Sequence, residues 1–218
     1  MAISGDKHRP CSIESPTETQ PPLPTILSHA AVPLALGVGL GSRTISRPLL
    51  AAGIVGAIAP DLDVIGFHFH VAYAHQLGHR GASHSATFAL ALALLALACA
   101  PWLRSGRMAA FCFVGLCTLS HGLLDMCTNG GLGIALWWPW SGVRLFTPWR
   151  VIEVSPLSLG RVFSARGWVV IRSELWWVWL PATLTAASLL GVRKLWPGPA
   201  LPVQAPGRAI DANRGHGR

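Results

Sequence analysis

The chain has 218 residues, of which 51% are hydrophobic and only 12% charged, and its mean hydropathy is +0.46. Soluble domains carry about a quarter charged residues, so this composition excludes a disordered chain and is typical of a membrane protein. The net charge of +8 would suggest nucleic acid in a soluble protein, but these arginines lie between apolar runs, so we expect membrane lipids and no nucleic acid as partners.

The first part of the chain, residues 1–24, is polar and rich in proline. It is too long and too acidic for the start of a signal peptide, and we predict a disordered tail. Residues 25–196 are predicted to form one helical membrane domain. A second disordered tail, residues 197–218, is predicted to follow.

Five apolar runs follow the first tail, and each approaches the length of about 20 residues that a spanning helix needs. The fifth run begins with three tryptophans and ends at Arg193 and Lys194, as an interface-anchored helix does. The sequence therefore predicts an all-α, polytopic membrane protein with about five transmembrane helices. The runs are residues 23–41, 48–67, 85–103, 108–127 and 175–192.

Ionisable residues inside or beside these runs are few and fall into four groups. Because a charge inside the hydrocarbon costs at least about 3 kcal/mol, such residues point to function. Tracing the chain back and forth across the bilayer brings all four groups to the same membrane surface. The groups are His29; Asp61 and Asp63; His79, Arg80 and His84; and His121 and Asp125.

The spacing within two of these groups predicts their local structure. His121 and Asp125 are four residues apart, which gives them one helix face. Asp61 and Asp63 are two apart and do not share a helix face, so we expect the helix to unravel after Pro60.

Imidazole and carboxylate together favour borderline or hard divalent cations such as Zn, Mn, Fe or Mg, and no thiolate lies near these groups. The set exceeds the needs of one tetrahedral zinc ion. It fits either a two-metal centre or one metal with further groups as general base and as orienting residues. A metal-bound water would become a nucleophile near neutral pH, which is the basis of metal-assisted hydrolysis.

Structural interpretations of the same residues stay open. A histidine in an apolar run is often only hydrogen-bonded, and a His–Asp hydrogen bond needs the same spacing as His121 and Asp125. The further histidines at 68, 70 and 75 also suit a plain interfacial segment. A short tryptophan-rich stretch, residues 132–140, is predicted to lie at the headgroup level.

A long basic connection, residues 129–173, is predicted to lie at the interface on the same side as the four groups. Arginine offers a bidentate fork for phosphate, so Arg144 and Arg150 are suited to hold a phosphoryl group. A basic segment that rests on anionic lipid explains the same residues.

The ordered series of motifs resembles the YdjM-type family of bacterial inner-membrane proteins. The series runs from Ser28-His29 through Pro60-Asp61-Leu62-Asp63, HRGxSH at 79–84 and SHGLLDxxT at 120–128 to RLFTPWRVIEVSP at 144–156. The family is described as predicted membrane-bound, metal-dependent hydrolases, some of them linked to the LexA-controlled damage response. The resemblance implies a multi-pass protein of the bacterial inner membrane with a divalent metal at the matching histidines and aspartates.

We therefore predict a membrane-bound, divalent-metal-dependent hydrolase that acts on a lipid-borne or membrane-proximal ester, preferably a phosphoester, with zinc among the possible metals. A metal or proton transporter and a non-catalytic membrane scaffold are the alternatives. The predicted metal ligands are His29, Asp61, Asp63, His79 and His121; the predicted catalytic groups are His84, Asp125 and Arg80; the predicted substrate-binding residues are Arg144 and Arg150.

Overall fold

The computed structural model describes residues 26–154 and 164–196; both predicted tails lie outside this part of the chain. All regular elements in the described residues are helices, accompanied by two isolated β-bridges, Thr128 with Ile152 and Ile134 with Leu145. The predicted all-α class is therefore confirmed for the described residues.

Three continuous helices are long and apolar enough to cross a membrane: Arg47–Phe69, Arg107–Met126 and Ala165–Leu195. Two apolar helices, Ala31–Leu40 and Ala86–Ala98, are shorter, so the number of five spans stays a prediction. In chain order the elements are α1 (Ile26–His29), α2 (Ala31–Leu40), α3 (Arg47–Ile58), the 3₁₀ helices η1 (Ala59–Phe69) and η2 (Ala82–His84), α4 (Ala86–Ala98), α5 (Arg107–Met126), α6 (Ala165–Glu174), the π-helix η4 (Leu175–Trp179) and α7 (Leu180–Leu195).

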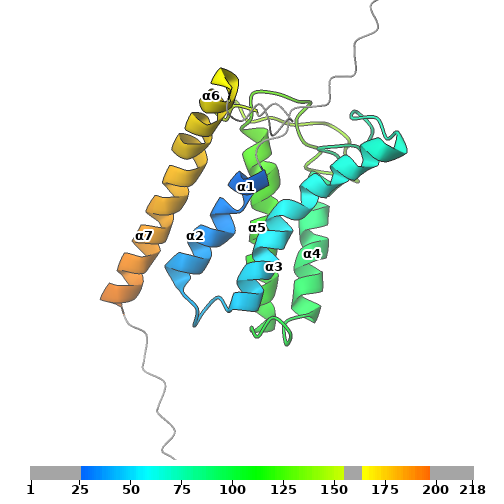
Figure 1. Ribbon diagram of the computed structural model, residues 1–218. Coiled ribbons are helices and arrows are strands. Elements are labelled where there is room, and N and C mark those ends of the chain that lie inside the picture. Colours follow the sequence, from blue (N-terminus) through cyan, green and yellow to red (C-terminus); the bar gives the residue numbers. More distant parts are fainter. Residues whose placement is uncertain (1–25, 155–163, 197–218) are drawn as a thin grey trace, which may run out of the picture.

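Helix α5 is the centre of the bundle, with α3 and α4 packed against it, while α2 packs against α7 (Figure 1). Small residues allow the helices to approach closely. A Cβ atom on Gly53 would lie 2.3 Å from the Phe113 ring, and one on Gly39 would lie 2.7 Å from Leu189. The core formed in this way contains Ile45, Leu49, Ala57, Ala96, Ala100, Ala110, Phe113, Val114 and Cys117.

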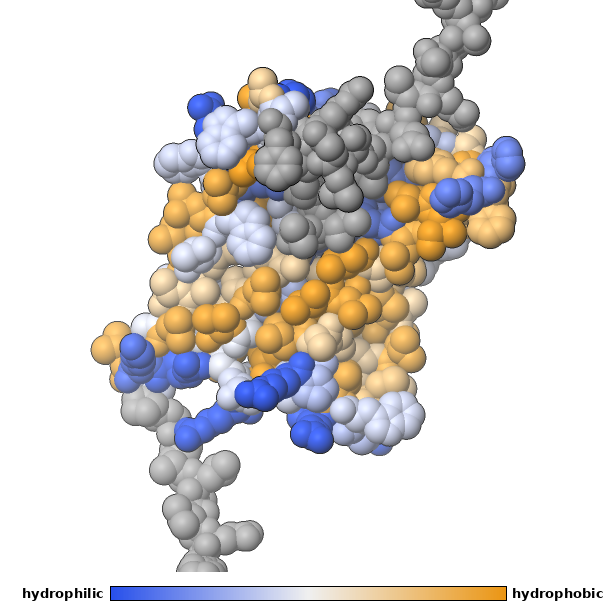
Figure 2. All heavy atoms as spheres, in the orientation of Figure 1, coloured by the Kyte–Doolittle hydropathy of each residue, from blue (hydrophilic) through white to orange (hydrophobic). Residues whose placement is uncertain are grey.

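The outer surface of the bundle is apolar over a broad band, with hydrophilic residues at its lower margin (Figure 2). Large side chains such as Val55, Leu94 and Leu184 are more than half exposed. An apolar surface of this kind is costly in water but suits the hydrocarbon of a bilayer, where the helices satisfy their own backbone hydrogen bonds.

Two prolines interrupt the helices near the upper end of the bundle. Pro33 cannot donate a hydrogen bond to the carbonyl of His29, which is where α1 ends. Pro60 marks the change from α3 to the 3₁₀ helix η1. The expectation that the chain unravels after Pro60 is wrong, because the helix tightens into 3₁₀ geometry and continues to Phe69.

The segment after α5 folds over the end of the bundle. Ala135 donates its N–H to the carbonyl of Arg80, and Ile134 is fully buried, whereas Trp137 and Trp140 are exposed. The stretch predicted at the headgroup level thus has a buried and an exposed side. The last helix begins at Ala165, inside the predicted connection, rather than at Leu175.

Candidate metal centre

The helix ends bring the four predicted groups together at the upper end of the bundle (Figure 1). His29 ends α1, Asp61 lies in η1, His84 ends η2, and His121 and Asp125 share one face of α5. All five side chains are buried. Tracing the chain across the bilayer correctly predicted that these residues lie close together at one end of the bundle.

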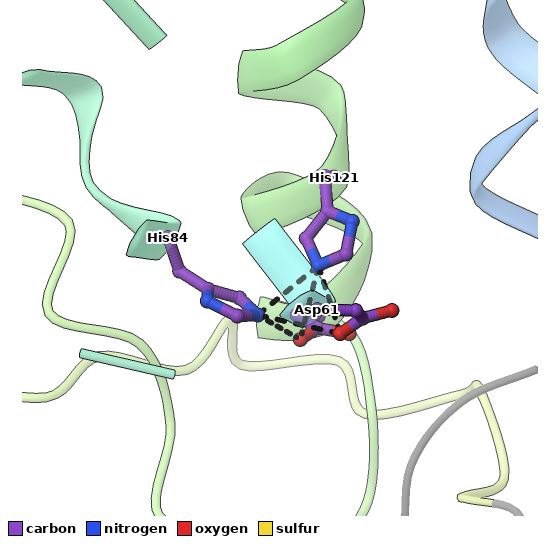
Figure 3. A group of neighbouring side chains, drawn as sticks. Asp61, His84 and His121 are labelled. Carbon is purple, nitrogen blue, oxygen red and sulfur yellow. Dashed lines mark hydrogen bonds and ion pairs between the residues drawn. The ribbon is translucent and has the colours of Figure 1, made fainter. Parts of the chain in front are cut away.

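Four of these residues form what we call the central group: Asp61, His84, His121 and Asp125. The Nε2 atoms of His84 and His121 lie 3.0 Å apart and point toward Asp61 (Figure 3). Nε2 of His84 lies 3.7 Å from a carboxylate oxygen of Asp61 and 3.3 Å from one of Asp125. For Nε2 of His121, the same distances are 3.4 and 3.9 Å. Ligands about 2.0–2.1 Å from a tetrahedral zinc ion are about 3.3 Å from one another, so these distances fit such an ion.

The contact that Nδ1 of His121 makes determines which of the two ring nitrogens carries the proton. Nδ1 lies 2.7 Å from the carbonyl oxygen of Ala57 and must donate to it, since a carbonyl only accepts. That oxygen is available because, in the 3₁₀ helix, the N–H of Asp61 bonds three residues back, to Ile58, rather than four. In the neutral imidazole, Nε2 therefore carries a lone pair that faces the central group.

His84 is oriented in the same way by Ser83 and Asp63. Its Nδ1 lies 3.0 Å from the Ser83 hydroxyl, which donates to Asp63, and 3.3 Å from an oxygen of Asp63 itself. Nδ1 is thus the protonated nitrogen and Nε2 again faces the central group. Asp63 also pairs with His79 at 2.7 Å, so it links His79 to His84 and acts on the central group through His84.

Burial lowers the pKa of His84, but the carboxylates of Asp125, Asp61 and Asp63 outweigh burial and raise the pKa well above its usual value. Without a cation, His84 therefore binds a proton readily at neutral pH. A metal ion and a proton compete for the same Nε2 lone pair.

Several buried polar atoms near the central group have no hydrogen-bond partner. They include both carboxylate oxygens of Asp61 and Asp125 and both ring nitrogens of His29. Buried polar groups are nearly always paired, so these atoms point to a ligand. With neutral imidazoles, the site has a net charge of −2, from the three carboxylates of Asp61, Asp63 and Asp125 and the one guanidinium of Arg80. One divalent cation balances this charge.

Arg80, predicted as a catalytic group, is fully buried behind Asp125. Its Nε lies 3.2 Å from Asp125, and its Nη1 donates to Thr128 and to the carbonyl of Gly130. The guanidinium thus fixes both the carboxylate and the turn after α5.

The two predicted substrate-binding arginines lie outside the central group. The guanidinium of Arg144 donates to the carbonyls of His79, Tyr73 and His75 and so ties the loops together. Arg150 is exposed and stacks 3.9 Å over the ring of Phe146. Among the described residues, a second cluster of potential metal ligands adjoins the central group and consists of Asp63, His79 and His84. Histidines 68, 70 and 75 are exposed and belong to neither cluster.

One residue that sequence reasoning missed is Glu174, at the end of α6. It is buried and lines a small pocket together with His29 and Asp125. It is also the only acidic residue in the helix Ala165–Leu195, which is the signal that would have identified it. The other residues of the pocket wall are Ser28, Leu124, Thr128, Ile152 and Val178.

Comparison with known proteins agrees with a membrane location. The sequence model described as "YdjM inner membrane protein" matches residues 24–197. The chain is 48% identical over 168 residues to the inner membrane protein YbcI of Escherichia coli (strain K12). The aligned region covers 77% of this chain and 97% of that protein. No solved structure matches the chain.

Proposed function

Because the chain belongs to the YdjM inner membrane protein family, we propose that it is a multi-pass membrane hydrolase whose central group binds a divalent metal ion and whose substrate is a membrane-proximal phosphoester. The five predicted spans belong to this proposal, with α1–α2 and α4 as the two shorter crossings.

One observation supports the metal above all others. His84 and His121 direct their Nε2 atoms at each other across 3.0 Å, and two carboxylates lie against the same point. Four lone-pair donors in a buried space repel one another unless a positive charge lies between them. A divalent cation held by two imidazoles and two carboxylates removes this repulsion, and zinc, manganese and iron all accept such ligands.

A bound divalent ion would supply a Lewis acid and a water whose pKa is near neutrality. The chain's own residues perform the remaining tasks. Asp63 keeps the proton of His84 on Nδ1, Ala57 keeps that of His121 on Nδ1, and Arg80 holds Asp125 in position. Each of these contacts keeps a ligand atom directed at the same point.

The surroundings of the centre support a membrane-proximal substrate. Asp125 lies in the last turn of the candidate span Arg107–Met126, and the centre lies toward one end of the bundle (Figure 1), where lipid headgroups would begin in a bilayer. Exposed basic residues, Arg150 among them, lie in the adjoining connection and suit an anionic headgroup.

The test is hydrolysis by the detergent-purified full chain. We expect phosphate release from a chromogenic phosphomonoester or from phosphatidic acid, dependent on added zinc or manganese. Asp61→Asn and His121→Phe should lose at least about 100-fold in rate, as expected when a metal ligand is removed. His75→Phe, at an exposed histidine outside the centre, is the matched control and should keep the wild-type rate.

Other outcomes would favour the alternatives. Metal-dependent ion flux in proteoliposomes, without hydrolysis of any ester, would favour a transporter. Purified protein that takes up no stoichiometric metal would favour a scaffold in which the histidines and aspartates only satisfy one another.

A further inference from the structure

We infer that the centre holds a second divalent cation, bound by His29 and bridged to the first by Asp61 and Asp125. This inference rests on the proposed function for the first ion. It makes the centre binuclear, and it gives His29 the role of ligand to the second ion alone.

The two carboxylates have the orientation that bridging requires. Asp61 directs Oδ1 at His84 and His121, while its Oδ2 lies 3.9 Å from Nε2 of His29. Asp125 directs Oδ2 at the same two histidines, while its Oδ1 lies 3.7 Å from Nε2 of His29. Each carboxylate therefore presents one oxygen to either side, as in two-metal sites whose ions lie about 3.5–4 Å apart.

His29 itself has the features of a ligand with no other task. It is 1% exposed, and neither of its ring nitrogens has a hydrogen-bond partner. Its ring stacks on that of His121 with centroids 3.7 Å apart, which holds it beside the central group. A buried imidazole whose two nitrogens make no hydrogen bond costs free energy unless a ligand occupies one of them.

The pocket found beside the centre lies on this second side. Its wall includes His29, Asp125 and the carboxylate-bearing Glu174, and the hydroxyl-bearing Ser28 and Thr128. Directly after Glu174 the last helix widens into the π-helix η4, a distortion that often marks functional sites. Glu174 thus adds a carboxylate, the type of group that hard divalent cations prefer, to the wall that His29 and Asp125 share.

A second ion also changes the charge that the substrate meets. The carboxylates of Asp61, Asp63, Asp125 and Glu174 and the guanidinium of Arg80 have a net charge of −3, and two divalent ions would change it to +1. Because that charge is positive, the binuclear centre favours an anionic phosphoester over a neutral carboxylic ester.

The test uses manganese as the probe, because two Mn²⁺ ions that share bridging carboxylates give an exchange-coupled electron paramagnetic resonance spectrum. The detergent-purified full chain should bind two Mn²⁺ and give the coupled spectrum. His29→Phe keeps the stacked ring but removes both nitrogens, and it should bind one Mn²⁺ with the uncoupled six-line spectrum. His70→Phe, at an exposed histidine outside the centre, should behave as the wild type.

The outcomes separate this inference from the proposed function. One uncoupled Mn²⁺ in the wild type, or two coupled ions in His29→Phe, overturns the second site and leaves the first intact. No Mn²⁺ in the wild type contradicts both. If His29→Phe binds no ion because it fails to fold, His29→Gln replaces it, and two coupled ions in that variant overturn the inference.

Discussion

The contribution of the bound ion to stability can be worked out and tested with His121→Phe. The substitution removes one of the four ligand atoms of the central group but keeps an aromatic ring to stack on His29. It also removes the hydrogen bond to Ala57, worth about 1 kcal/mol, so the variant begins from a lower melting temperature. The informative quantity is therefore the change on adding metal, not the melting temperature itself.

The expected size of that change follows from mass action. Free zinc at 100 times its dissociation constant stabilises the folded state by about 2.7 kcal/mol. For a chain of this size, each kcal/mol corresponds to about 2–4 °C. Zinc should therefore raise the melting temperature of the wild type by about 5–11 °C, and that of His121→Phe by less than about 2 °C because only three of the four ligands remain.

Unfolding in detergent can be followed by tryptophan fluorescence, since the chain contains 10 tryptophans. Samples stripped with a chelator are compared with samples given zinc. His75→Phe is the control and should show the full wild-type rise. An equal rise in His121→Phe and in the wild type would refute a role for His121 in metal binding.

Three further predictions concern the residues that support the centre. Arg80→Met leaves Asp125 buried without its counter-ion and should lower the free energy of unfolding by about 3–5 kcal/mol, measured by chemical denaturation in detergent; a loss under about 1 kcal/mol would show that the pair is not needed. His84 has a raised pKa without metal, so zinc must displace its proton. Zinc affinity, measured by calorimetry, should therefore fall about tenfold per pH unit on acidification below that pKa. An affinity independent of pH would contradict this competition. Gly131 has φ +78°, and a Cβ atom there would lie 2.6 Å from the Tyr73 hydroxyl and 2.8 Å from Nη1 of Arg80. Gly131→Ala should therefore lower the free energy of unfolding by about 1–3 kcal/mol. Gly106→Ala is the control and should change it far less, because a Cβ atom there meets nothing within 4 Å.

Much of the centre could be predicted from sequence because its residues occur at the ends of apolar runs. Counting those runs placed His29, Asp61 and His121 on one side of the bundle, and the distances between them confirm that they meet. The four-residue spacing of His121 and Asp125 gave their shared helix face in the same way.

Other features depend on long-range contacts that carry no local sequence signal. Asp63 pairs with His79, outside the central group that contains Asp61, and both aspartates lie in the 3₁₀ helix that begins near Pro60. A proline in the sequence does not show whether a helix tightens into 3₁₀ geometry or unravels. The burial of Arg80 depends on its contact with Thr128, 48 residues away. Glu174 comes near His29 because the last helix packs against α2, which no spacing in the sequence indicates.

The most direct test of the central claim is X-ray absorption at the zinc edge of the purified, zinc-loaded chain. We expect a shell of nitrogen and oxygen ligands at about 2.0–2.2 Å, with imidazole scattering that decreases by one histidine in His121→Phe. A shell containing sulfur at about 2.3 Å, or a spectrum that is the same in the wild type and in His121→Phe, would contradict it.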